Sequence, residues 1–157
     1  MEEVNGNLIK LALEGNFDII AHGCNCFCRM GSGIAPQIKE AFPGAGSVDQ
    51  LTKTGDIMKL GTYTYVNAPY YDESVKLTKT LIVINAYTQY NYDAKTKPLD
   101  YEALTLCMRK INHNYPGKTI GLPKIGSGLA GGHWPYIKTI IKAELKDMNI
   151  IIVNYVK

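Results

Sequence analysis

Short apolar runs alternate with helical patterns along this chain. Most of the runs are rich in Ile and Val and do not alternate with polar residues, which is typical of strands buried on both faces. These runs cover residues 17–22, 80–87, 119–122 and 149–155. A fifth run, residues 60–66, alternates more and is predicted to lie nearer the edge of a sheet.

Apolar residues at helical spacing lie between these runs. They predict helices over residues 8–14, 34–42, 104–111 and 135–145. Gly15 is expected to end the first helix, Asp100 can cap the third, and Pro135 fits the first turn of the fourth. Buried strands that alternate with helices indicate an α/β fold, a three-layer α/β/α sandwich with a mixed, largely parallel central sheet, formed by residues 1–157 as a single domain.

Composition and charge exclude several classes of protein. Hydrophobic residues make up 46% of the 157 residues and charged residues 20%, so disordered, collagen-like and coiled-coil interpretations have no support. The net charge of +3 is spread along the chain without a basic run, so a nucleic-acid partner is not expected. The acidic N-terminus and the absence of an apolar run of roughly 18 residues predict a cytoplasmic protein without a membrane partner.

The four cysteines do not form a familiar framework. Cys24, Cys26 and Cys28 alternate at spacing two and Cys107 stands apart, which fits neither a secreted disulfide framework nor paired C-x-x-C zinc motifs. We therefore expect reduced thiols, no metal and no cofactor. A metal site on His22 and the three clustered cysteines is the weaker alternative, because alternate cysteines share one face of an extended segment but the fourth ligand is unassigned.

Glycines gather in two segments that each follow a predicted strand and precede a predicted helix. They are residues 22–36 and 121–135, and neither contains an Asp or Glu. Ligands of open α/β sheets bind beyond the carboxyl ends of strands, where helix N-termini offer unpaired N–H groups to anions. The two segments therefore predict two phosphate-binding loops, together suited to a diphosphate. Neither matches the P-loop or the dinucleotide-binding pattern.

Five short motifs, in this order, resemble the macro domain (macrodomain) family, which binds ADP-ribose. They are VNGNL at residues 4–8, IAHGCN at 20–25, MGSGIA at 30–35, IVINAY at 82–87 and LPKIGSGLAGGHW at 122–134. Within the family the chain looks most like the branch that contains ADP-ribose 1″-phosphate phosphatases and terminal ADP-ribose-glutamate hydrolases. It is similar there to small stand-alone versions found in bacteria and phages.

The resemblance implies a site for ADP-ribose or ADP-ribose 1″-phosphate. It places Asn7 and Leu8 at the adenine, with Asn where the family usually has Asp. It offers Tyr155 as the aromatic cover of the adenine, and the alternative is a tyrosine packed at the end of the sheet. The first glycine loop is expected to hold the terminal ribose and one phosphate, and the second loop the other phosphate. The ligand-binding residues that it implies are Asn7, Leu8, Gly23, Cys24, Asn25, Met30, Gly31, Ser32, Gly33, Ile34, Ala35, Asn85, Ala86, Tyr87, Ile125, Gly126, Ser127, Gly128, Leu129, Ala130, Gly131 and Tyr155.

Three residues are candidates for catalysis. The resemblance directs Asn25 at the terminal ribose and matches His22 with the first-loop His of phosphatase-like members, and His133 stands beside the second loop. A His at such a place can act as acid or base, or can make a structural hydrogen bond. The Lys and Asp that glutamate-linkage hydrolases use have no counterpart, because the aligned region shows residues 85–87 and Ala130.

The resemblance implies a hydrolase that binds ADP-ribose and converts ADP-ribose 1″-phosphate to ADP-ribose and phosphate. Removal of ADP-ribose from a modified protein or nucleic acid is one alternative, which adds ADP-ribosylated macromolecules as partners. A non-catalytic reader of ADP-ribose is another. Tyr87, Tyr90 and Tyr92 follow the central strand and either line the terminal-ribose side or pack as ordinary strand-end residues.

Overall fold

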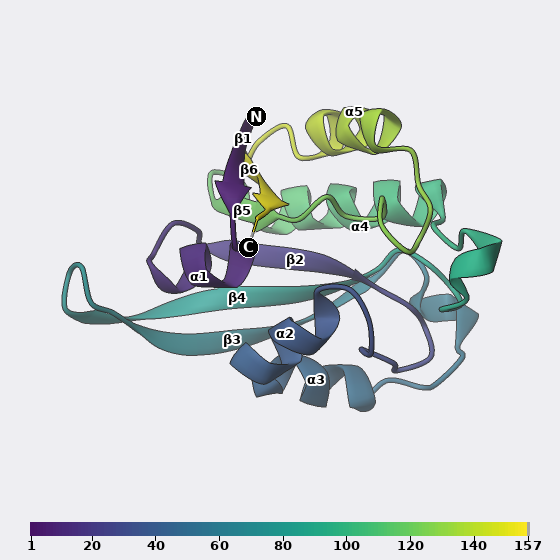
Figure 1. The fold of residues 1–157 in the computed structure, drawn as a ribbon, viewed down its shortest axis with the longest axis horizontal. Coiled ribbons are helices and arrows are strands. Elements are labelled where there is room, and N and C mark those ends of the chain that lie inside the picture. The colour runs from purple at the N-terminus through teal and green to yellow at the C-terminus, as the bar shows by residue number, and fades with distance from the viewer. Residues whose placement is uncertain (157) are drawn as a thin grey trace.

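Six strands form one mixed sheet in the computed structural model, which describes residues 1–156 (Figure 1). The strands are β1 (Glu2–Gly6), β2 (Ile19–Cys24), β3 (Tyr63–Asp72), β4 (Leu77–Tyr87), β5 (Thr119–Leu122) and β6 (Asn149–Tyr155). They lie in the order β1-β6-β5-β2-β4-β3, and all neighbours are parallel except the antiparallel pair β3 and β4. The predicted mixed, largely parallel sheet is confirmed, and the alternating run near residue 60 lies in the edge strand β3.

Helices cover both faces of this sheet. They are α1 (Leu8–Leu13), α2 (Ala35–Ala41), α3 (Pro43–Gln50), α4 (Tyr101–Asn114) and α5 (Trp134–Glu144), with short 3-10 helices at Ile57–Lys59 and Ala94–Thr96. One core cluster joins Leu8, Ile38 and Ala45 of the first three helices to one face of the sheet. The helices α4 and α5 pack on the other face, so the predicted three-layer α/β/α sandwich is confirmed.

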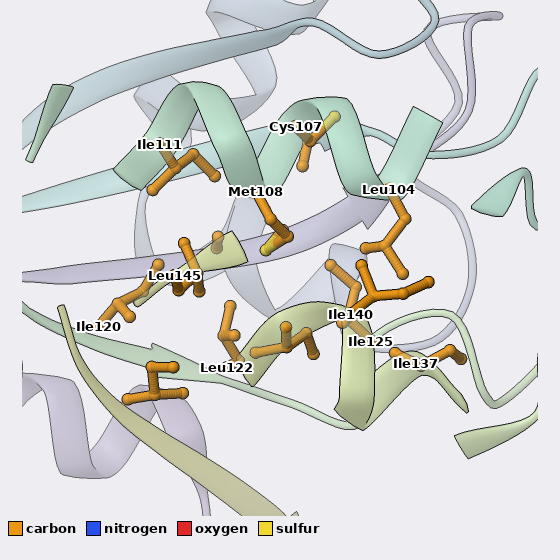
Figure 2. Packing of buried hydrophobic residues seen from close by; sticks show 14 of the residues in the cluster. Leu104, Cys107, Met108, Ile111, Ile120, Leu122, Ile125, Ile137, Ile140 and Leu145 are labelled. Atoms are coloured by element: carbon orange, nitrogen blue, oxygen red, sulfur yellow. The ribbon is translucent and has the colours of Figure 1, made fainter. Parts of the chain in front are cut away.

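The α4–α5 face holds the larger set of buried residues (Figure 2). Leu104, Met108 and Ile111 of α4 share one core cluster with Ile120 and Leu122 of β5, and all five are completely buried. Burial of one such side chain contributes roughly 1.5–3 kcal/mol. This packing holds β5, and thus the loop that follows it, in a fixed position.

Local signals place the helix ends as expected. The Asp100 side chain accepts a hydrogen bond from the Ala103 N–H at 2.9 Å, and Pro135 lies in the first turn of α5. Gly15 adopts a φ of +85° just after α1, a conformation that glycine takes at no steric cost.

The hydrophobic pattern of the sequence did not predict two of the elements, β1 and α3. The strand β1 begins with exposed Glu2 and Glu3 and pairs only with β6 at the sheet edge. The helix α3 contains two glycines, and a Cβ at Gly44 would lie 2.8 Å from the Val66 side chain. Tertiary packing, rather than local propensity, therefore holds both elements. Within residues 1–156, no helix is both long and apolar enough to cross a membrane.

The β3–β4 hairpin carries an ion pair that depends on pH. Lys79 Nζ lies 2.8 Å from Asp72 Oδ2, and the Asp72 side chain is 2% exposed. The Lys79 ammonium and the Ser74 hydroxyl, which donates to Asp72 at 2.6 Å, lower the pKa of Asp72 from 3.8 to about 2.

We expect Asp72→Asn to destabilise the protein in a pH-dependent way. Because the folded-state pKa of Asp72 is lowered, its stabilisation is complete above the ordinary carboxyl pKa and is lost as the pH falls toward 2. Urea unfolding of wild type and variant from pH 7 to pH 2 should show a difference in free energy that shrinks on acidification. A difference that stays constant over this range would contradict the assignment.

Candidate functional site

Both glycine loops emerge at the same edge of the sheet. The strands β2 and β5 are parallel neighbours, with Ile19 opposite Ile120, so their carboxyl ends lie side by side. The chain then turns to opposite faces, because α2 packs in one core cluster and α5 in the other. A crevice at the carboxyl ends of such strands is the usual ligand site of α/β sheets.

Two adjoining cavities occupy this edge. The first, here the loop cavity, is lined by both glycine loops and by residues that follow β4. The second, here the apolar cavity, lies between the start of α1 and the end of β6. Gly33, Ile34 and Pro123 line both, so the two cavities form one cleft.

Most of the expected ligand-binding residues line this cleft. Those in the loop cavity are Gly23, Cys24, Asn25, Met30, Ser32, Gly33, Ile34, Ala35, Ile125, Gly126, Gly128, Leu129 and Ala130. Asn7, Leu8 and Tyr155 line the apolar cavity together with Gln37 and Val153. The Asn7 Oδ1 atom also caps α1, accepting from the Lys10 N–H at 3.1 Å.

The loop cavity offers backbone donors. Within residues 1–156, the N–H groups of Ser32, Gly33, Leu129 and Ala130 have no hydrogen-bond acceptor. A Cβ at Gly33 or Gly128 would meet no atom within 4 Å, and Gly33 has a φ of +64°. The loops thus combine open space with free amide donors, an arrangement that binds anions.

Hydrogen bonds inside the second loop fix its shape. The Gly132 N–H donates to the Gly126 carbonyl at 2.8 Å, and the Gly131 N–H donates to the Gly128 carbonyl at 3.0 Å. Gly126 has a φ of +77°, and a Cβ there would lie 2.9 Å from Leu99. The backbone donors of this loop are therefore held in place before a ligand arrives.

The charges that line the loop cavity are of one sign. Among its described lining residues, Arg29 and Lys124 are cations and none is Asp or Glu. A cleft with one sign of charge attracts a ligand of the opposite sign. The cavity therefore suits an anion.

The Asn25 amide holds the first loop together. Its Nδ2 group donates to the Arg29 carbonyl at 2.8 Å, and its Oδ1 accepts from the Phe27 N–H at 2.9 Å. An amide nitrogen carries two protons, so one N–H remains for a ligand in the cavity that Asn25 lines.

His22 lies outside both cavities. It is completely buried, and its Nε2 atom lies 2.8 Å from Asn85 Oδ1 on the neighbouring strand β4. Burial lowers the pKa of His22 below 6.5, so the imidazole is neutral at pH 7. Asn85 in turn donates to the Ala45 carbonyl at 2.9 Å. The pair has the geometry of a structural link between the sheet and α3.

Several other expected residues also do not line the cleft. Ala86 and Tyr87 are buried in β4, where the Tyr87 hydroxyl donates to Asp49 at 2.7 Å. His133 is exposed at the start of α5. Gly31, Ser127 and Gly131 belong to the glycine loops but lie outside the cavity linings.

The clustered cysteines are packed as thiols. Cys24 and Cys26 are buried, and burial raises the pKa of Cys24 well above its ordinary value and that of Cys26 to about 11. In the part of the chain that the structure describes, no group of three or more His, Cys, Asp or Glu is arranged to hold a metal ion.

The structure adds five lining residues that the sequence did not single out for binding, namely Arg29, Gln89, Pro98, Pro123 and Lys124 of the loop cavity. Of the three tyrosines that the sequence offered for the terminal-ribose side, Tyr92 lines the loop cavity, whereas Tyr87 and Tyr90 do not. Arg29 is the only charged residue in the first glycine loop, which is a signal that sequence reasoning could have used. Gln89 and Tyr92 come from the polar segment after β4, whose path to the cavity is set by tertiary structure.

Comparisons with known proteins agree with this architecture. No family model matches the chain. An uncharacterized 17.5 kDa protein of Enterobacteria phage T4, from the tk-vs intergenic region, is 36% identical over 157 residues, covering 97% of this chain and 94% of that protein.

Solved structures share the fold. The macrodomain of Mycobacterium tuberculosis DarG superposes with a TM-score of 0.68 at 17% identity, covering 97% of this chain and 95% of that chain. Thermosipho africanus DarTG, solved in complex with ADP-ribose, gives a TM-score of 0.71 at 16% identity over 97% of this chain and 40% of that chain.

The phage T4 relative places both chains in one family. The TM-scores of 0.68 and 0.71 show that the chain shares its fold with these macrodomain-containing structures. The chain therefore belongs to the family of the phage T4 protein and has the macrodomain fold.

Proposed function

We propose that this protein binds ADP-ribose in the cleft and removes the terminal phosphate from ADP-ribose 1″-phosphate. The observation that carries the proposal is the loop cavity, which combines free backbone donors with two cations and no carboxylate among its described lining residues. The ADP-ribose complex of a structural neighbour supports the choice of ligand.

The two cavities match the two halves of this ligand. The apolar cavity takes the adenine between Leu8, Ile34 and Val153, with Tyr155 at its open side. The loop cavity takes the diphosphate, whose oxygens accept hydrogen bonds from the loop amides. The terminal ribose then lies toward Asn25, which retains a free N–H.

The proposed reaction is a hydrolysis of a phosphate monoester. The oxygen of a water molecule bonds to phosphorus, and the bond between phosphorus and the ribose oxygen breaks. One proton of the water passes by way of a phosphate oxygen to the ribose oxygen, and the other stays on the released phosphate. Catalysis of such a transfer consists mainly of positioning the water and the phosphate and of stabilising the negative charge of the transition state. The cavity supplies both through its amides and cations, and the substrate phosphate takes the proton of the attacking water.

One observation also favours a second candidate, a reader that binds ADP-ribose without turning it over. None of the described residues that line the loop cavity is Asp, Glu or His, the usual general bases. A phosphate-release assay with ADP-ribose 1″-phosphate separates the two functions, with a protein glutamate-linked ADP-ribose substrate as a further arm. Binding without release from either substrate would select the reader.

We expect Gly33→Glu to weaken ADP-ribose binding at least about tenfold, measured by calorimetry. The new side chain enters open space in the cleft and brings a negative charge beside the diphosphate. Gly117→Glu is the matched control, because Gly117 also has a positive φ, +83°, and open space but lies outside the cleft. Equal affinities of the two variants would contradict the proposed site.

We expect His22→Ala to affect folding rather than binding. Removal of the imidazole leaves the buried Asn85 oxygen without its partner, which costs about 1–3 kcal/mol of unfolding free energy. Denaturant unfolding and calorimetry on the same preparation should show lower stability with ADP-ribose affinity within about threefold of wild type. Unchanged stability with lost phosphate release would assign His22 to catalysis instead.

A further inference from the structure

A cation over an aromatic ring forms part of the loop cavity wall. The Arg29 guanidinium carbon lies over the Tyr92 ring, 4.7 Å from its centroid, and both residues line the loop cavity. A cation–π contact uses none of the five N–H donors of a guanidinium in a hydrogen bond. These N–H groups form a fork that fits two oxygens of a phosphate.

Neighbouring residues hold this pair in place. The Phe27 ring packs edge-on against Tyr90 at 4.9 Å and against Tyr92 at 5.9 Å between centroids. The Tyr90 hydroxyl donates to the Gly55 carbonyl at 2.8 Å. These contacts hold the Tyr92 ring, and the ring in turn restricts the Arg29 side chain. Arg29 therefore loses less conformational entropy when it binds a ligand.

The backbone before Arg29 is also fixed. Cys28 has a φ of +57°, a conformation that is uncommon outside glycine, and Gln50 Nε2 donates to its carbonyl at 2.8 Å. On the other side, the Arg29 carbonyl accepts from Asn25 at 2.8 Å. A residue held in such a turn points to a functional position.

Arg29 forms no ion pair with the residues that the structure describes. Within residues 1–156, the ion pairs are Lys79–Asp72, Arg109–Glu144 and Lys138–Glu3, and none includes Arg29. A guanidinium with no partner among these residues, in a cavity whose described lining has no carboxylate, is available to an anionic ligand.

Arg29 lies away from the part of the cleft proposed for adenine. The residues shared by both cavities are Gly33, Ile34 and Pro123, whereas Arg29, Gln89 and Tyr92 line only the loop cavity. Asn25, which closes the turn that carries Arg29, faces the same cavity. The cation therefore stands at the side to which the proposed binding mode assigns the terminal ribose and its substituent.

We propose that Arg29, over the Tyr92 ring, binds the phosphate on the terminal ribose and makes the site prefer a phosphorylated over an unmodified terminal ribose. This inference rests on the proposed binding of ADP-ribose. Arg29 is a specificity-determining residue in this scheme, and Tyr92 is a positioning residue that acts through it.

The test is calorimetric binding of ADP-ribose and of a non-hydrolysable phosphonate analogue of ADP-ribose 1″-phosphate, the phosphorylated ligand of this test, to wild type, Arg29→Gln and Arg29→Lys. We expect wild type to bind the phosphorylated ligand about tenfold more tightly, and Arg29→Gln to remove this preference with little effect on ADP-ribose. Arg29→Lys should keep part of the preference, because it retains the charge but not the fork. Tyr92→Leu should weaken the phosphorylated ligand selectively.

Lys124→Gln is the matched control, since it removes the other cation of the cavity and should weaken the binding of both ligands alike.

Equal weakening of the binding of both ligands by Arg29→Gln, or no effect on either, would overturn the role of Arg29. If wild type binds ADP-ribose and the phosphorylated ligand equally tightly, the role of Arg29 is overturned and the proposed function stands. Wild type that binds neither ligand would overturn the proposed function itself. Should Arg29→Gln fail to fold, a wild-type preference that does not fall with added salt would count against the inference.

Discussion

The parallel pairing of β2 with β5 is the constraint on which the site depends. It joins Ile19 to Ile120 and Ile20 to Gly121, and it brings two segments about a hundred residues apart to one edge of the sheet. A Cβ at Gly121 would lie 2.8 Å from the Phe17 ring, so a larger residue there would displace the ring packed beside this pair. Because the next helices lie on opposite faces, the loops separate and leave the cleft between them.

Electrostatics gives this cleft its chemistry. Backbone donors and two cations face a space whose described lining contains no carboxylate, so a negative ligand is stabilised without a competing internal anion. The same composition removes the usual general bases from the cavity wall. Binding and phosphate chemistry therefore fit the site better than reactions that need an Asp or Glu of the protein.

Much of the fold and part of the site could be predicted from the sequence. Buried strands and the two glycine segments carry local signals, since β5 is an apolar run and Gly126 sits at a φ of +77° that favours glycine. The strand β1 and helix α3 lack such signals because packing determines them. The placement of His22 against Asn85, and of Tyr92 beneath Arg29, depends on contacts between distant segments, which no local pattern contains.

The central claim is that both glycine loops bind one ligand in the cleft. Its most direct test is a titration of the ¹⁵N-labelled protein with ADP-ribose, in which NMR records the chemical shifts of the backbone amides. We expect the largest changes at Ser32, Gly33, Leu129 and Ala130, whose N–H groups gain an acceptor in both loops at once. Amides of the distant β3–β4 hairpin, such as Ser74, should not move. Shifts confined to one loop, or spread over surfaces away from the cleft, would contradict the account.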